Sequence, residues 1–109
     1  MDRWDEILPD LEVAVRDAGQ IIQQNWDKPR KITRKGRIDL VTDTDVAVEN
    51  KLLESLSKLL PEADFLAEES SSDNTLGELT WVIDPLDGTT NFAHKLPAVA
   101  ISVGLWASE

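Results

Sequence analysis

Residues 81–92 read Trp81-Val82-Ile83-Asp84-Pro85-Leu86-Asp87-Gly88-Thr89-Thr90-Asn91-Phe92. The apolar start predicts a buried strand that ends in a carboxylate. If Pro85 stiffens the turn, Asp84 and Asp87 converge on one point, which the Leu86 carbonyl also faces. Hard oxygen ligands of this kind suit Mg²⁺, so the turn is a candidate metal site.

The residues after the second aspartate are typical of a phosphate site. Gly88 lets the backbone turn tightly into a short helix, whose first N–H groups at Gly88, Thr89 and Thr90 are placed to bind an anion. Taken alone, a D-x-x-D pair is more often an ordinary turn in which Asp and Thr cap a helix. The whole string favours neighbouring metal and phosphate sites over that alternative.

The N-terminal stretch predicts an amphipathic helix. Between Trp4 and Trp26 the apolar residues recur at three- and four-residue spacing, so one face needs burial. Pro9 is tolerated in a first helical turn, where its missing N–H costs little. We therefore expect the regular helix to begin between Asp5 and Pro9.

A second amphipathic helix is expected from Thr42 to about Leu60, where Pro61 ends it. Thr42 and Asp45 fit a capping box in which Asp stands in place of the usual Glu or Gln. In that interpretation Asp45 only satisfies a free amide at the start of the helix. A role for Asp45 in catalysis is the alternative, and the capping pattern does not decide between the two.

Three short strands complete the predicted fold. They span 63–68, 79–84 and 98–106, and a surface loop at 70–77 separates the first two. The third stretch is rich in small and apolar residues, which suits burial on both faces. The order of helices and strands predicts a mixed α and β fold.

A basic segment interrupts the acidic average of the chain. Six of the eleven basic residues lie within 28–37. One interpretation is a solvated turn or short hairpin around Gly36, since charge runs usually mark exposed segments. The other is a mobile basic loop that attracts a phosphorylated substrate toward an acidic, metal-filled site.

Composition excludes several classes of protein. The 109 residues carry a net charge of −10, which opposes non-specific binding to nucleic acid and to anionic membranes and favours cations as partners. The absence of cysteine excludes disulfide scaffolds, Cys-ligated zinc and thiol catalysis. No apolar run is long enough for a membrane span, and the first residues lack the order of a secretory signal. We therefore expect a soluble, cytoplasmic chain.

Three separate matches give a resemblance to a known family. Residues 84–92 resemble the signature of the inositol monophosphatase family of magnesium-dependent, lithium-sensitive phosphatases. Residues 39–45 are similar to its helix-opening motif, and residues 67–70 to its Gly-Glu-Glu-Ser segment, with Ala67 in place of the first glycine. The resemblance implies an α/β (α+β) fold that forms the N-terminal part of a layered α-β-α-β-α sandwich.

The resemblance also bears on the extent of the domain. It covers nearly all of residues 1–109, whereas family members are well over twice as long. Their last metal-ligating aspartate lies in a Trp-Asp-x-Ala motif, which this sequence lacks. We expect residues 1–109 to be the N-terminal part of such a domain, with the C-terminal half absent.

Carried onto this sequence, the resemblance implies a metal centre of two or three Mg²⁺ ions. The expected ligands are Glu68, Asp84, the Leu86 carbonyl and Asp87, with Asp84 bridging two ions. Glu69 is expected not to bind a metal itself, because successive strand residues face opposite sides. Its expected role is to contact the ligands or to stabilise the fold.

The resemblance implies two further roles near the metals. Asp45 and Thr89 position the attacking water and help to deprotonate it. The backbone amides of Gly88, Thr89 and Thr90 hold the phosphate. The implied reaction is metal-assisted hydrolysis without a phosphoenzyme.

The implied activity is release of phosphate from inositol 1-phosphate or a similar sugar or polyol phosphate, by an enzyme that is a homodimer when full-length. Fructose 1,6-bisphosphatase or nucleotide 3′-phosphatase activity is an alternative within the same superfamily. The haloacid-dehalogenase-like phosphatases are a rival class, but their D-x-D-G-T string differs from the D-x-x-D-G-T here. A non-catalytic remnant or interaction module is the remaining alternative.

Other residues capable of site chemistry are assigned structural roles. A lone His94 has no partner at metal-site spacing, so we expect a solvated residue at a helix end. Trp4, Trp26, Trp81 and Trp106 lie at apolar-face or strand positions, where core packing is expected.

Overall fold

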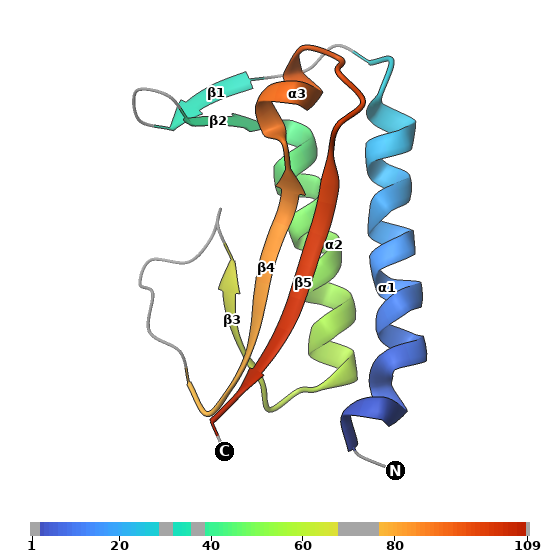
Figure 1. The fold of residues 1–109 in the computed structure, drawn as a ribbon, viewed down its shortest axis with the longest axis vertical. Helices are drawn as coiled ribbons and strands as arrows, with labels where there is room; N and C mark the ends of the chain where they lie inside the picture. Colours follow the sequence, from blue (N-terminus) through green and yellow to red (C-terminus); the bar gives the residue numbers. More distant parts are fainter. Residues whose placement is uncertain (1–2, 29–31, 36–38, 68–76, 109) are drawn as a thin grey trace.

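The computed structural model describes residues 3–28, 32–35, 39–67 and 77–108. Its helices and strands follow one another as α1 (Arg3–Asn25), β1 (Ile32–Lys35), β2 (Asp39–Thr42), α2 (Asp43–Leu59), β3 (Asp64–Ala67), β4 (Leu79–Asp87), α3 (Thr89–Ala93) and β5 (Ala100–Ala107). The predicted mixture of helices and strands, and their order, are confirmed (Figure 1).

Helix α1 begins earlier than predicted. It starts at Arg3 and contains Pro9 in its interior, so the expected start between Asp5 and Pro9 was wrong. An interior proline removes a backbone hydrogen bond and costs about 3 kcal/mol. Trp4 and Ile7 precede Pro9 and pack, partly buried, against the core. Full burial of a large apolar side chain contributes about 1.5–3 kcal/mol, so partial burial of these two side chains is large enough to offset the proline.

Helix α2 has the predicted N-terminal cap. Thr42 is the N-cap residue, and both hydrogen bonds of a capping box with Asp45 are present. The helix ends at Leu59, with Leu60 as its C-cap, and Pro61 follows because proline cannot continue the helical hydrogen bonds.

The strands form two separate sheets. One has the order β3-β4-β5, with β4 parallel to β3 and antiparallel to β5. The strand expected to end at Asp84 continues to Asp87 as β4, but its register with β5 breaks between these two residues. Pro85 lies in the break and has no N–H to donate to a neighbouring strand. The predicted turn is therefore a break in the pairing near the end of a strand.

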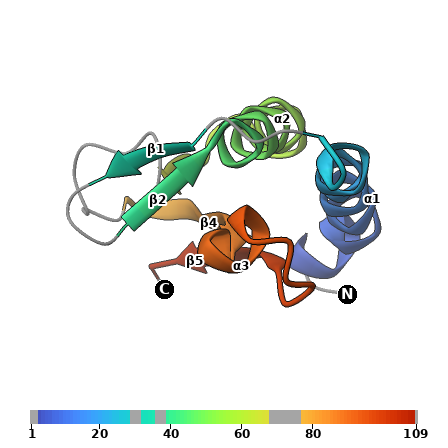
Figure 2. The ribbon, with the colours of Figure 1, turned by 90° about the horizontal axis from the view of Figure 1, so that it is seen from above.

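Helices α1 and α2 pack side by side against one face of this sheet (Figures 1 and 2). Fully buried Trp81 of β4 lies in the core with Leu52 and Leu56 of α2. Residues of β5 are alternately exposed and half-buried, so the predicted burial of this strand on both faces was wrong. Trp106 is 40% exposed, which also contradicts its predicted place in the core.

The basic segment contributes to a hairpin. β1 and β2 pair antiparallel, with Ile32 opposite Thr42 and Lys35 opposite Asp39, which confirms the hairpin interpretation for the described part. Residues 29–31 and 36–38 lie outside the described residues, as do Glu68, Glu69 and most of the predicted loop at 70–77. Among the described residues, no helix is long and apolar enough to cross a lipid bilayer.

Candidate functional site

Asp45 is held at the N-terminus of α2 by its own capping box. Its Oδ1 accepts a hydrogen bond from the backbone N–H of Thr42 at 2.9 Å and another from the Thr42 hydroxyl. In return, the Asp45 N–H donates to Thr42 Oγ1 at 3.2 Å. Asp45 is 1% exposed, so these contacts fix a carboxylate that water barely reaches.

The other oxygen of Asp45 faces α3. Thr89 Oγ1 donates to Asp45 Oδ2 at 2.8 Å, and it also lies 3.0 Å from the Leu86 carbonyl oxygen. A threonine hydroxyl has a single proton, and the carboxylate is the stronger acceptor. The proton therefore belongs to the bond with Asp45, which leaves lone pairs of the Leu86 carbonyl available to another partner.

The capping and site interpretations of Asp45 are thus compatible. One oxygen satisfies the cap, and the other contacts Thr89, a residue 44 positions away in the sequence. This long-range contact brings together two of the predicted site residues and the predicted Leu86 carbonyl.

The turn at Gly88 has the predicted form. Gly88 has φ 97° and ψ 35°, a left-handed conformation, and it is the N-cap residue of the five-residue helix α3. A Cβ at this position would lie 2.5 Å from the Ala98 carbonyl oxygen. Both the positive φ and this close approach require glycine.

Asn91 links the short helix after Gly88 to residues 96–98, a role that the sequence pattern did not indicate. Its Nδ2 donates to the Ala98 carbonyl at 2.9 Å, and the Asn91 backbone carbonyl accepts from the N–H of Leu96 at 2.8 Å. These two bonds hold residues 96–98 against Gly88. No motif marks such a contact, because it joins a side chain to a backbone carbonyl in a loop.

Asp84 and Asp87 lie at the end of β4, on either side of the break in register. Asp84 is half-buried and Asp87 is exposed. Within the residues that the structure describes, neither carboxylate accepts a hydrogen bond or forms an ion pair. Two unpaired carboxylates and an available carbonyl, at Leu86, are the donor set that a hard divalent cation prefers.

The described residues contain no cluster of three or more His, Asp or Glu placed to hold a metal ion. The expected cluster included Glu68, which lies outside them. His94 is exposed at the C-cap of α3, which confirms its prediction as a solvated residue at a helix end.

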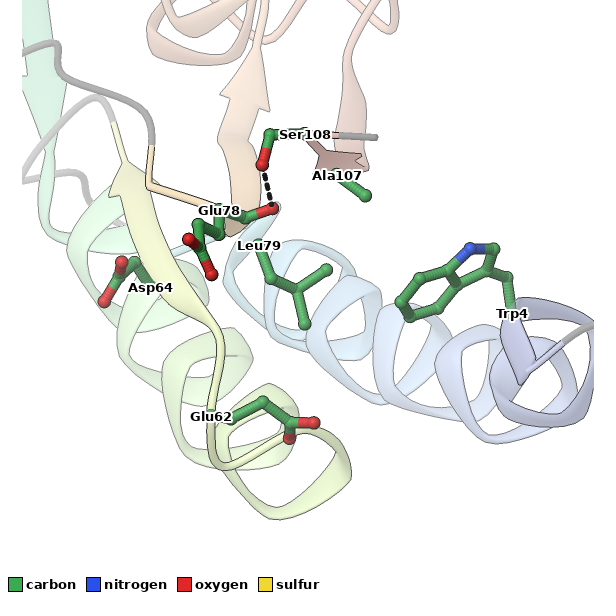
Figure 3. A pocket seen from close by; sticks show the side chains of 7 residues that line it. All are labelled: Trp4, Glu62, Asp64, Glu78, Leu79, Ala107 and Ser108. Atoms are coloured by element: carbon green, nitrogen blue, oxygen red, sulfur yellow. Dashed lines mark hydrogen bonds between the residues drawn. The ribbon is translucent and has the colours of Figure 1, made fainter.

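A cavity adjoins the Gly88 turn. Its lining residues are Asp87, Gly88, Asn91, Pro97, Ala98, Val99 and Ala100. A second pocket lies at the opposite end of the sheet and is lined by Trp4, Glu62, Asp64, Glu78, Leu79, Ala107 and Ser108 (Figure 3). It shares no residue with the turn at 84–92 and is separate from the candidate site.

Fold and turn together define a class: a layered α/β protein in which an Asp-rich strand end leads through a glycine into a short helix. A sequence model of the inositol monophosphatase family matches residues 3–109. The chain belongs to the inositol monophosphatase family.

Individual relatives agree with this assignment. An inositol monophosphatase of Dictyostelium discoideum is 43% identical over 105 residues, which are 93% of this chain and 39% of the relative. Mouse inositol monophosphatase 2 is 41% identical over 109 residues, with 93% and 37% covered. The crystal structure of the extragenic suppressor protein suhB from Bartonella henselae superposes with a TM-score of 0.85 at 31% identity, covering 94% of this chain and 41% of that one. The chain thus spans well under half the length of these relatives.

Proposed function

We propose that this chain carries the metal- and phosphate-binding part of a magnesium-dependent phosphomonoester hydrolase. The observation that carries the proposal is the 2.8 Å hydrogen bond between Thr89 Oγ1 and the buried Asp45 carboxylate. It joins two motifs far apart in the sequence, and the Leu86 carbonyl lies 3.0 Å from the same hydroxyl.

The proposed Mg²⁺ ligands are Asp84, the Leu86 carbonyl and Asp87, together with Glu68, for two or three ions. The donor set supports this choice, because all of these groups offer oxygen and two of the carboxylates lack other partners within the described residues. When bound, Mg²⁺ would supply positive charge that acidifies water and offsets the charge of the phosphoryl oxygens.

The protein's own residues would position and deprotonate the nucleophile. With its proton committed to Asp45, the Thr89 hydroxyl has oxygen lone pairs that accept a hydrogen bond from a water molecule. As that water attacks phosphorus and the P–O bond to the leaving alkoxide breaks, Thr89 would take the proton of the water and pass its own to Asp45, while the alkoxide takes a proton from solvent. The buried carboxylate is held by Thr42 on its other oxygen, so it does not have to reorient during the transfer.

The start of α3 would hold the phosphate. The first N–H groups of a helix have no intrahelical acceptor, and the first helical bond here runs from the Phe92 N–H to the Gly88 carbonyl at 2.9 Å. The amides of Gly88, Thr89 and Thr90 are therefore proposed to bind phosphoryl oxygens.

The proposed substrate is inositol 1-phosphate or a related sugar or polyol phosphate, supported by membership of the family. We also propose that residues 1–109 act as the N-terminal part of the domain, because they match only 39% of the Dictyostelium relative. Lithium sensitivity, a homodimer and a cytoplasmic location are proposed on the same resemblance. Sedimentation of the whole protein tests the dimer.

Titration calorimetry with Mg²⁺ tests the metal site directly. We expect Mg²⁺ to bind the chain, and Asp84→Asn and Asp87→Asn each to weaken binding by tenfold or more, the effect of about 1.4 kcal/mol. Glu12→Gln removes the same charge from an exposed position on α1 and should leave the affinity unchanged. Equal weakening by all three variants would show that only the net charge matters and would contradict the proposed site.

Turnover of candidate substrates tests the chemistry. Inositol 1-phosphate, fructose 1,6-bisphosphate and 3′-phosphoadenosine 5′-phosphate are assayed side by side with Mg²⁺, with and without Li⁺, on the chain and on the longest protein that contains it. We expect inositol 1-phosphate to be preferred and Li⁺ to inhibit. An aspartyl-phosphate trapped on Asp84 would instead support the covalent mechanism of the rival class.

A further inference from the structure

The C-terminal end of α1 contacts both elements that carry the Asp45–Thr89 pair. Asn25, the last residue of α1, donates from Nδ2 to Thr44 Oγ1 at 3.0 Å. Thr44 is 1% exposed and precedes Asp45 in the first turn of α2. Asn25 therefore contacts the residue directly before the buried Asp45.

The neighbouring residue reaches the other element. The Trp26 ring lies 5.6 Å from the Phe92 ring, centroid to centroid, with an edge-on angle of 66° between the planes. Phe92 is fully buried and belongs to α3, the short helix that begins with Thr89. Figure 1 shows the end of α1, the start of α2 and α3 at the same end of the molecule.

Helix α3 depends on such tertiary contacts. It has only five residues, and an isolated helix of this length is unstable in water. Burial of Phe92, whose ring contacts the Trp26 ring, and the hydrogen bond from Thr89 to Asp45 are two contacts that hold it.

We propose that Asn25 and Trp26 are positioning residues, which set the start of α2 and α3 relative to each other and so maintain the hydrogen bond between Thr89 and Asp45. The contacts described above join Asn25 to Thr44 and Trp26 to Phe92, and neither Thr44 nor Phe92 is a candidate metal ligand. The catalytic consequence rests on the proposed function, whereas the effect on the hydrogen bond does not. A shift of about 1 Å in a reacting group is enough to cost two orders of magnitude in rate.

A double-mutant cycle measures the hydrogen bond without any assay of activity. Asp45→Ala, Thr89→Val and the double variant are unfolded in urea. Each single variant changes the unfolding equilibrium constant by some factor, and the coupling is the ratio between the change in the double variant and the product of the two single changes. For a hydrogen bond to a buried carboxylate we expect coupling of about tenfold or more. The loss of the α2 cap occurs in both arms that contain Asp45→Ala and cancels.

The same cycle is repeated in the Trp26→Leu and Asn25→Ala backgrounds. We expect the coupling to fall to about threefold or less in Trp26→Leu, with a smaller fall in Asn25→Ala, and Trp26→Phe to restore it. Ala14→Gly is the control, because it destabilises α1 at a buried position far from this end and should leave the coupling intact. Undiminished coupling in both Trp26→Leu and Asn25→Ala would overturn the proposal, and Asn25→Ala keeps the test decisive if Trp26→Leu does not fold.

Activity then separates this proposal from the proposed function. In an active form of the protein, Trp26→Leu should lower kcat by tenfold or more and leave Mg²⁺ affinity unchanged, since Asp84, Leu86 and Asp87 lie on β4. Failure of the wild-type protein to bind Mg²⁺ or turn over substrate would contradict the proposed function alone. Loss of coupling in the unfolding cycle would still support the positioning role in that case.

Discussion

Replacement of Thr89 by Val removes one hydroxyl from the centre of the candidate site. The branched shape of the side chain is kept, but the donor to Asp45 Oδ2 at 2.8 Å is lost. Asp45 is 1% exposed, so water has little access to replace that donor. The variant therefore leaves a buried carboxylate with fewer partners.

The size of the effect follows from the charge and the burial. A hydrogen bond to a charged group contributes about 1.5–3 kcal/mol to stability, and a group left unsatisfied in the interior costs a similar amount. Oδ1 keeps its two bonds from Thr42, so the carboxylate remains partly satisfied and about 2 kcal/mol is expected. For a domain of this size, each kcal/mol corresponds to about 4–8 °C in Tm.

Urea denaturation of the two variants Thr89→Val and Thr90→Val is the assay. Thr90 is the exposed neighbour in the same short helix, so its substitution should change the free energy of unfolding by no more than about 0.5 kcal/mol. Thr89→Ser keeps the hydroxyl and should recover most of the loss. A free energy of unfolding for Thr89→Val within about 0.5 kcal/mol of the wild type would refute the reasoning, because the contact would then contribute nothing to stability.

Three further substitutions test other parts of the fold. Gly88→Ala should destabilise the chain by about 1–3 kcal/mol, because φ is 97° and the new Cβ would lie 2.5 Å from the Ala98 carbonyl oxygen; Gly104→Ala, with no atom within 4 Å of its Cβ, is the control in thermal melts. Pro9→Ala should raise Tm, since Pro9 is exposed inside α1 and its replacement removes a penalty of up to about 3 kcal/mol; an unchanged or lower Tm would mean that the helix is already adapted to the proline. Thr42→Ala should cost about 1–2 kcal/mol by removing the side-chain half of the capping box, and circular dichroism with urea would show no such loss if water caps α2 equally well.

The sequence predicted those features that depend on local chemistry. Thr42 and Asp45 were recognised as a cap from their spacing alone, and Gly88 as a tight turn into a short helix; both are confirmed. Each is set by residues within a few positions of one another, so a pattern in the sequence is sufficient to identify it.

Features that depend on tertiary packing were predicted less well. The start of α1 was misplaced because the partial burial of Trp4 and Ile7 outweighs an interior proline, and this balance is invisible without the core. β5 was expected to be buried on both faces because of its composition, yet only one of its faces is covered by helices. Composition reports how apolar a strand is, but it does not report which neighbours are present.

The contacts of the candidate site also differ in whether the sequence indicated them. Resemblance to a family implied a shared role for Asp45 and Thr89, and the structure has a hydrogen bond between them, whereas the contacts of Asn25 and Trp26 had no sequence signal. A side chain at the end of a long helix meets its partners through the path of the whole chain, and no spacing rule marks such a meeting.

The two halves of the site differ in how much they depend on a cation. The cap of α2 holds Asp45, and Thr89 donates directly to its other oxygen, so contacts within the protein assemble this pair. Asp84 and Asp87 have no such partners among the described residues, and carboxylates gathered around one ion repel each other until it binds. Mg²⁺ should therefore raise Tm through the end of β4 and leave the Asp45–Thr89 coupling unchanged. If the coupling instead appeared only with Mg²⁺, contacts within the protein would not be enough to organise the pair, and the metal would have to order both halves together.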